Sequence, residues 1–442
     1  MKWQARTLGE GGGIDYDEDF PASEAASVPV PLLRPFPGLR PTPAHAAQVV
    51  APPYDVLSSD EARIVAADKP LSFLHVSKPE IDLPEGIDVH APEVYAKGAE
   101  NLRAMIEAGV LVQDASPCFY VYRLSMGGHA QTGIVGGASV AAYDENRIRK
   151  HEFTRPDKED DRVRQIDACN AQTGPVLLAH RDHPDVAAAI AQVIKGRPAY
   201  TVMAADKVIH TLWVMDDPDM LDRVTRAFDA MPALYIADGH HRSAAASRVA
   251  MMRRGRDGAG DGEAAHESFL AVTFPMREMM ILDYNRVVRD LGGHSPESFL
   301  AAVDAEYSVE AISGLARPAC PRSLGMYLGG QWYRLVLRNP PPADPVARLD
   351  VSLLSERLLG PVLGIEDLRK DVRIDFVGGR RGLGELEKRV DSGEMAVAFA
   401  MYPTSMLELT SVADSGQVMP PKSTWFEPKL ADGMVSYPLD WR

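Results

Sequence analysis

The chain has 442 residues, of which 45% are hydrophobic and 25% are charged. This composition is typical of globular proteins and excludes a disordered chain, a fibrous repeat and a small disulfide-stapled domain. The 47 basic and 62 acidic residues give a formal net charge of −15, which disfavours broad nucleic-acid binding because phosphate backbones are bound by basic surfaces. At about 150 residues per domain, the length predicts roughly three structural units.

Cysteine usage and hydropathy indicate the setting of the protein. Cys118, Cys169 and Cys320 lie far apart, and their spacing is not typical of zinc ligands. Such cysteines favour a reduced, cytoplasmic environment. The apolar runs are too short for a signal peptide or a membrane span. We therefore expect a soluble cytoplasmic protein that has no membrane partner.

The predicted elements begin after an N-terminal segment without periodicity. Residues 1–30 are Gly-rich and acidic, so we expect a flexible tail. Residues 31–55 are dense in proline, which predicts extended and turn-rich backbone. We interpret Tyr54-Asp55 as part of a turn, with a position beside the candidate site as the alternative. Hydrophobic periodicity then predicts helices over 92–111, 160–171, 184–195 and 218–231, and strands over 119–124, 134–143 and 208–214.

The second half of the chain continues the mixture of helices and strands. An apolar strand over 233–237 is followed by Asp238-Gly239 and a small-residue helix over 240–254. Further strands are predicted over 269–274, 326–328, 332–337, 372–377 and 395–402, and further helices over 349–363 and 383–390. The pattern predicts an α+β (mixed α/β) fold with sheets at its core. We expect a tail at 1–30, α/β portions at 31–145 and 291–442, and a phosphate-binding portion at 146–290.

The turn after the strand at 233–237 is the strongest candidate site. Gly239 permits a tight turn, and the helix N-terminus that follows has free backbone N–H groups suited to a phosphate. His240, His241 and Arg242 add donors in the first turn, where cations are unfavourable without a bound anion. Asp238 is a candidate Mg²⁺ ligand, although Asp is also a common N-cap, so a purely structural role stays open.

A basic stretch at 147–158 is the second candidate. Arg149, Lys150 and His151 suit an anionic ligand, and Glu152 inside the stretch is a candidate general base. The alternative is a solvated loop whose salt bridges contribute little to stability.

A C-terminal stretch is the third candidate. Lys422, Ser423 and Thr424 follow two prolines and could line an anion site. The alternative is a strap that packs Trp425 and Phe426 into the core.

Several stretches together resemble the domain of unknown function 1015 family of bacteria and archaea. They span roughly residues 34–436 and are, in chain order, Pro35-Phe36 with Leu39-Arg40-Pro41, the segment 51–56, Arg149-Lys150-His151-Glu152 with Thr154, the segment 237–242, the segment 284–288, and Met419-Pro420-Pro421-Lys422-Ser423-Thr424. On these motifs the chain is identified as a member of that family.

A wider resemblance concerns the Asp-Gly-His-His-Arg turn at 238–242. It is similar to the phosphate-binding turn of the ParB and sulfiredoxin superfamily, which includes nucleotide-dependent free serine kinases. The resemblance implies a ParB/sulfiredoxin-like unit within 146–290. It also implies that Glu152 deprotonates a serine hydroxyl, while Asp238, His240, His241 and Arg242 lie at the phosphates.

The expected function follows from this resemblance. It implies a phosphotransferase that acts on a small hydroxy amino acid, most simply free L-serine, with ATP or ADP and Mg²⁺, in either direction. The alternatives are a ParB-like nucleotide-binding switch and a phosphatase or nuclease that uses the same turn. We expect a small-molecule substrate and a nucleotide as partners, rather than nucleic acid or a membrane, and a homodimer stays open.

Overall fold

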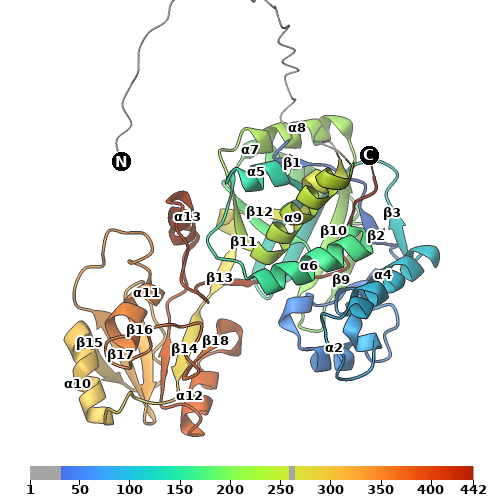
Figure 1. The fold of residues 1–442 in the computed structure, drawn as a ribbon. Helices are drawn as coiled ribbons and strands as arrows, with labels where there is room; N and C mark the ends of the chain where they lie inside the picture. Colours follow the sequence, from blue (N-terminus) through green and yellow to red (C-terminus); the bar gives the residue numbers. More distant parts are fainter. Residues whose placement is uncertain (1–30, 258–263, 442) are drawn as a thin grey trace, which may run out of the picture.

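The computed structural model describes residues 31–257 and 264–441, and these form a mixed α/β fold with two large sheets (Figure 1). The predicted fold class is confirmed. The tail expected at 1–30 lies outside the described residues. Among the described helices, none is long and apolar enough to cross a membrane.

The larger sheet contains nine strands of the described chain. In order across the sheet they are β6 (Ile148–Arg149), β11 (Leu234–Asp238), β8 (Val176–His180), β12 (Ser268–Pro275), β5 (His129–Ser139), β4 (Phe119–Met126), β10 (Ile209–Met215) and β9 (Tyr200–Met203), and β1 (Leu33–Arg34) pairs with β5. Helices associated with this sheet are α5 (Val140–Asp144), α6 (Pro156–Cys169), α7 (Pro184–Val193), α8 (Pro218–Asp229) and α9 (His240–Asp257). The sheet thus joins strands from two of the portions expected from the sequence.

Helix α9 lies close to the sheet because its inner side chains are small. Ala245 and Ala246 are buried, and the helix contacts β8, β12 and α6. Small side chains at this interface let the backbone of the helix approach the strands. The first turn of α9 is therefore held rigidly against the sheet.

The second sheet contains six described strands. In order they are β15 (Tyr307–Ile312), β17 (Gln331–Leu337), β16 (Ser323–Leu328), β19 (Val397–Ala400), β14 (Tyr284–Val288) and β18 (Ile374–Gly378). Its helical segments are α10 (Pro296–Glu306), α11 (Asp350–Leu354), the π-helical η5 (Ser355–Leu359), the 3₁₀ segment η6 (Gly379–Arg381), α12 (Gly384–Asp391) and α13 (Met406–Asp414).

The chain crosses between the two sheets twice. Strand β13 (Met280–Leu282) leads out of the first sheet and pairs antiparallel with β20 (Trp425–Glu427), which leads back; Figure 1 shows β13 at this junction. The last residues then return to the first body, where β21 (Tyr437–Pro438) pairs with β7 (Ala171–Gln172). A segment from the C-terminal end of the chain therefore lies beside the first sheet.

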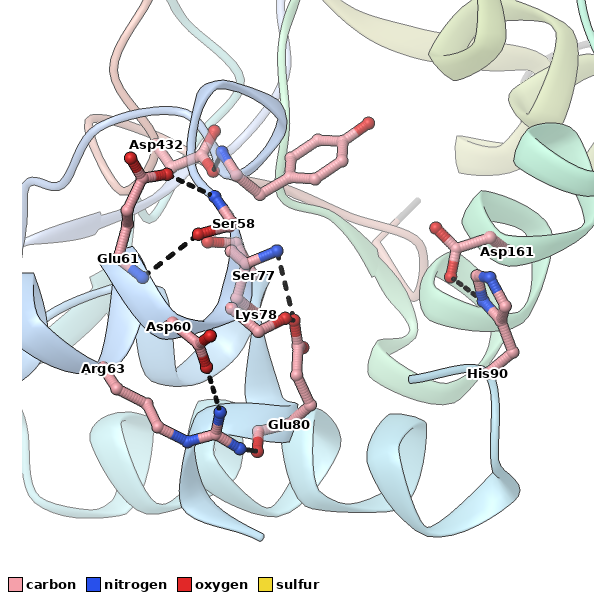
Figure 2. A network of polar contacts seen from close by, with 12 residues as sticks. Ser58, Asp60, Glu61, Arg63, Ser77, Lys78, Glu80, His90, Asp161 and Asp432 are labelled. Atoms are coloured by element: carbon pink, nitrogen blue, oxygen red, sulfur yellow. Dashed lines mark hydrogen bonds and ion pairs between the residues drawn. The ribbon is translucent and has the colours of Figure 1, made fainter. Parts of the chain in front are cut away.

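The N-terminal region contacts this returning segment through the bridges Ala51–Asp432 and Leu39–Ser436, and it contains several helices. The helices are α1 (Ala46–Val49), α2 (Ser59–Ala66), α3 (Leu74–Ser77), α4 (Pro92–Glu107) and the 3₁₀ segments η1 (Tyr54–Val56) and η2 (Pro79–Asp82). In the same region, β2 (Leu39–Pro41) pairs with β3 (Leu111–Gln113). Elsewhere in the chain, the 3₁₀ segments η3 (Ala265–Glu267) and η4 (Met276–Glu278) flank β12. Figure 2 shows Asp432 of the returning segment in one view with the Ser58–Glu61 capping box of α2 and the Lys78–Glu80 ion pair. Asp432 Oδ2 accepts a hydrogen bond from the Tyr54 N–H at 3.1 Å.

Most predicted elements are present, and the differences at their ends include the following three. The strand expected over 134–143 ends at Ser139, whose side chain accepts from the Ala142 N–H and caps α5. The helix expected over 92–111 ends at Glu107, shortly before Gly109 at φ +67°. The helix expected over 349–363 is α-helical only to Leu354 and then continues as a π-helix.

Candidate functional site

A cleft of about 220 Å³ opens where β11 ends and α9 begins. Its walls come from five separate parts of the chain, namely Tyr54-Asp55, His151-Glu152, the turn 238–242, Tyr284, and several residues between Met419 and Lys429. All three stretches singled out in the sequence therefore contribute residues to one cleft.

Strand pairing explains how two of these stretches meet. β6 and β11 run parallel, with Ile148 opposite Leu234 and Arg149 opposite Tyr235. The residues that follow each strand leave the sheet at the same edge. As a result, Glu152 Oε2 lies 3.8 Å from His240 Nδ1.

Asp238 is held by two cations at the end of β11. Lys429 Nζ lies 3.1 Å from Oδ2, and an Arg242 terminal nitrogen lies 3.6 Å from Oδ1. Burial would raise the pKa of this carboxyl, but the charges of Lys429 and Arg242 outweigh that effect and hold it well below its ordinary value. Gly239, at φ +99°, stands between Asp238 and the first helical residue, so Asp238 is one position too early to be the N-cap.

Arg242 is already engaged by the protein. It is only 9% exposed, and its guanidinium donates to the Pro175 carbonyl and lies 3.5 Å from Asp55. The sequence suggested that Arg242 adds donors for a phosphate. In the structure it instead fixes the positions of Asp55 and Asp238, because most of its donors point at protein groups.

The histidines of the site are neutral. Burial lowers the pKa of His151 to about 4, and burial together with the neighbouring His151 holds the pKa of His240 well below its ordinary value. The rings of His151 and His240 meet edge to face with their centres 4.5 Å apart, and His240 Nε2 accepts a hydrogen bond from the backbone N–H of His151 at 3.5 Å. A neutral ring that accepts at Nε2 carries its proton on Nδ1, the atom nearer to Glu152. The first turn thus lacks the imidazolium charges that the sequence suggested.

His241 also accepts a backbone hydrogen bond. Its Nε2 lies 3.1 Å from the Arg155 N–H, and burial lowers its pKa below the ordinary value. Its ring lines the cleft.

Among the acidic residues that line the cleft, Glu152 has the most exposed side chain. Its side chain is 47% exposed. Partial burial and the negative charge of Asp238 raise the pKa of Glu152, while the positive charge of Lys422 lowers it by a smaller amount. A carboxylate with a raised pKa is a stronger base than an ordinary glutamate.

The stretch from Met419 to Lys429 lines the cleft and also packs into the protein. Lys422 adopts φ +60°, and its carbonyl accepts from the fully buried Arg286 at 3.0 Å. Ser423 is buried, and its hydroxyl donates a hydrogen bond to the Pro420 carbonyl at 2.7 Å. Phe426 is buried in the core, as the strap interpretation expects, whereas Trp425 is only half-buried and lines the cleft. Lys422, Ser423 and Thr424 nevertheless face the cleft, so the two interpretations hold together.

Arg149 and Lys150 do not line the cleft. Arg149 pairs with Asp414, and Lys150 Nζ lies 3.8 Å from the centre of the Tyr143 ring. Burial lowers the pKa of Lys150. Of the basic stretch, His151 and Glu152 are the candidates that the structure brings to the turn.

Sequence analysis did not name Lys429 and Tyr284 as site residues, and it gave a position beside the site only as an alternative for Tyr54 and Asp55. Tyr54 and Asp55 stood in a Pro-rich segment that was interpreted as a turn, and the segment is indeed a 3₁₀ turn, but it borders the cleft. Lys429 follows the Lys422 stretch closely, so a search for cations along the whole strap would have found it.

The carboxylates of the site suit a metal only together with a ligand. Among residues 31–257 and 264–441 there is no group of three His, Cys, Asp or Glu side chains arranged to hold a metal ion. Mg²⁺ is usually bound by one or two carboxylates, waters and substrate phosphates rather than by an all-protein cage. Asp238 fits that arrangement as a single carboxylate.

Comparison with known proteins gives distant structural likenesses. No curated protein matches the chain. Among solved structures, a free serine kinase in complex with AMP is 10% identical, with a TM-score of 0.30 over 66% of this chain and 86% of that chain. A conserved hypothetical protein from Pyrococcus furiosus is 13% identical, with a TM-score of 0.31 over 68% of this chain and 93% of that chain. SbnI with a C-terminal truncation from Staphylococcus aureus is 13% identical, with a TM-score of 0.31 over 69% of this chain and 87% of that chain. Likenesses of this strength transfer neither a ligand nor an activity.

A family model supplies a firmer assignment. The model described as protein of unknown function (DUF1015) matches residues 33–352. This range is more than half of the chain and includes the Asp238–Arg242 turn together with Glu152. The family membership predicted from the motifs is confirmed, and the chain belongs to the DUF1015 family.

Proposed function

We propose that the cleft binds a nucleotide and that the protein transfers a phosphoryl group between this nucleotide and the hydroxyl of a small amino acid. The observation that carries the proposal is the position of Glu152, an open carboxyl with a raised pKa, in one cleft with the α9 N-terminus and the ammonium groups of Lys422 and Lys429. The acceptor, free L-serine, rests on the resemblance of the 238–242 turn to that of free serine kinases.

The phosphates would lie at the first turn of α9. Backbone N–H groups there have no intrahelical partner, and the helix dipole favours an anion. Lys422 and Lys429 add positive charge to the same cleft. Phosphoryl transfer depends mainly on positioning and on neutralising the phosphate oxygens, which this arrangement provides.

The acceptor hydroxyl would meet Glu152. Glu152 takes the hydroxyl proton as the hydroxyl oxygen bonds to the terminal phosphorus of the nucleotide, and the bond from that phosphorus to the bridging oxygen breaks. ATP would yield ADP and phosphoserine, and ADP would yield AMP. The reverse reaction would form serine from phosphoserine. His240 Nδ1 lies 3.8 Å from Glu152 Oε2, so it is a polar neighbour of the base without a direct hydrogen bond to it.

Asp238 is the residue that would hold Mg²⁺. The ion supplies charge neutralisation for the phosphate oxygens when it is bound. Lys429 and Arg242 keep the Asp238 carboxyl ionised, which a metal ligand requires.

The architecture also carries proposals of its own. We assign the ParB/sulfiredoxin-like unit to residues 146–290, supported by the parallel β6–β11 pair that brings Glu152 to the turn. The portions 31–145 and 291–442 complete the cleft through Tyr54 and Lys422. The free thiols of Cys118, Cys169 and Cys320 support a cytoplasmic setting.

The test is to follow the phosphorus NMR spectrum of the protein incubated with L-serine, Mg²⁺ and either ATP or ADP. A phosphoserine signal that depends on serine supports the proposal. Nucleotide loss without a phosphorylated acceptor identifies a switch or a hydrolase and overturns it. Asp238→Asn should abolish transfer. Asp217→Asn, which removes a charge from the N-cap of α8 outside the cleft lining, serves as the control.

A further inference from the structure

A second cavity of about 220 Å³ lies at the other end of β8. Leu177 of β8 stands opposite Asp238, whereas His180 at the far end of the strand lines the second cavity. At about 3.3 Å per residue, these two positions are roughly 10 Å apart. No residue lines both cavities. The second cavity is therefore distinct from the proposed nucleotide cleft.

One side of the cavity is aliphatic. Val186, Ile190 and Ile194 come from α7 and the residue that follows it, and they recur at helical spacing along one face. Ala187 and Ala191 add small side chains to the same wall. This wall suits a hydrocarbon body rather than a sugar or a phosphate chain.

The opposite side carries an arginine without a carboxylate partner. In the described chain, Arg123 makes no ion pair; its Nε donates to Thr132 Oγ1 at 3.0 Å, and its guanidinium lies 5.4 Å from the centre of the Trp213 ring. These two contacts leave both terminal nitrogens of Arg123 available. A planar guanidinium held in this way is suited to a carboxylate.

The other charges at the cavity balance one another. Arg277 pairs with Asp182 and Glu278, and Glu278 also accepts from the Thr132 N–H at 2.8 Å. Arg123 is therefore the lining cation whose charge the described chain does not neutralise.

His180 supplies a neutral polar group. Its Nδ1 lies 2.8 Å from Thr273 Oγ1, which leaves Nε2 for a ligand, and burial lowers its pKa to about 3. A neutral imidazole can donate to or accept from an uncharged group of the ligand, but it does not add a second positive charge.

We propose that this cavity binds a small aliphatic monocarboxylate, with the carboxylate on Arg123 and the hydrocarbon body against Val186, Ile190 and Ile194. The cavity is smaller than a typical site for a drug-sized molecule, so it selects short chains. An apolar amino acid and a short fatty acid share this chemistry. The proposal does not rest on the function proposed for the cleft.

The test is a titration series followed by isothermal calorimetry on the full chain. The probes are propanoate, butanoate, pentanoate and hexanoate, together with L-leucine and pentylamine. Each added methylene that becomes buried should tighten binding by about fourfold until the cavity is full. Pentylamine, which lacks the carboxylate, should not bind. Stronger binding of L-leucine than of hexanoate identifies an amino acid as the source of the carboxylate, and the converse identifies a fatty acid.

Three variants test the location of the site. Arg123→Gln should weaken binding of the tightest probe by about tenfold or more. Since this change also removes a contact with Thr132, Ala187→Phe is the second variant, because it fills the cavity from an exposed position on α7. Ala188→Phe, next to it but outside the lining, is the matched control and should bind normally. Equal binding of pentylamine and pentanoate, no binding of any carboxylate, or unchanged binding in Ala187→Phe overturns the proposal.

Discussion

Lys429 Nζ lies 3.1 Å from Asp238 Oδ2, although 191 positions separate the two residues. The contact exists because the chain returns from the second sheet through β20 and lays its last segment across the turn at the end of β11. The lysine that pairs with Asp238 therefore lies outside the range that the family model matches.

Replacing Lys429 by methionine should weaken both the site and the fold. The Asp238 carboxylate would keep only the more distant Arg242 as a partner, at 3.6 Å. Leaving a partly buried carboxylate under-compensated costs about 1–3 kcal/mol of unfolding free energy. We expect nucleotide affinity to fall by about tenfold, measured by calorimetry beside urea unfolding. Lys370→Met, which removes an exposed lysine paired with Asp367, should change neither quantity.

Glu152→Gln should remove catalysis while sparing nucleotide binding. A general base contributes about 10²–10⁴ to the rate, so turnover should fall by that range. Because the pKa of Glu152 is raised, the rate of the unaltered protein should rise with pH as this carboxyl loses its proton. The variant should lose this dependence. The measurement is the initial rate of phosphoserine formation across pH, and full activity in the variant would exclude Glu152 as the base.

Two glycines near α9 should respond in opposite directions to alanine. Gly239 has φ +99°, and a Cβ there would lie 3.1 Å from Arg242 Nε, so Gly239→Ala should destabilise the protein and displace Arg242. Gly255 lies within the same helix with open space around it, so Gly255→Ala should stabilise the protein by about 0.5–1 kcal/mol. Thermal unfolding of both variants checks the prediction. Equal effects would contradict the assigned turn geometry.

Asp432 should make the fold less stable as pH rises. Burial and the nearby charge of Asp55 raise its pKa to about 7. A carboxyl with a raised folded pKa contributes its full stability below the unfolded pKa, about 4, and loses it between that value and about 7. The shift of about three units corresponds to at most about 4 kcal/mol.

Asp432→Asn removes this titration and keeps an oxygen for the Tyr54 N–H. The variant should therefore gain stability relative to the unaltered protein at pH 8 but not at pH 4, measured by urea unfolding. Asp440→Asn, at an exposed position nearby, is the control and should leave the pH dependence unchanged. If the free energy of unfolding of Asp432→Asn changed with pH in the same way as that of the unaltered protein, the prediction would be wrong.

The local elements could be predicted because they depend on neighbouring residues. Apolar periodicity located β11, β12 and α8. Errors arose at ends of elements, where one contact decides the outcome. The Ser139 side chain, for example, caps a short helix where β-propensity alone favoured more strand.

Charge states could not be predicted in the same way. The residues 240–242 suggested up to three cations in sequence, yet burial makes His240 neutral, and Arg242 is engaged by Pro175 and Asp55. Desolvation depends on what packs against a group, and this information is not local to the motif.

The amino-acid sequence by itself determined the family, the mixed α/β class, and the turn at Asp238 and Gly239, because these depend on composition, periodicity and short motifs. Only the tertiary structure decided that Glu152 meets this turn while Lys150 turns away, and that Lys429 completes it. The physical reason is that parallel pairing of β6 with β11 and the return of the chain through β20 join segments that are distant in sequence. Such long-range pairing is selected by the burial of whole faces rather than by any single motif.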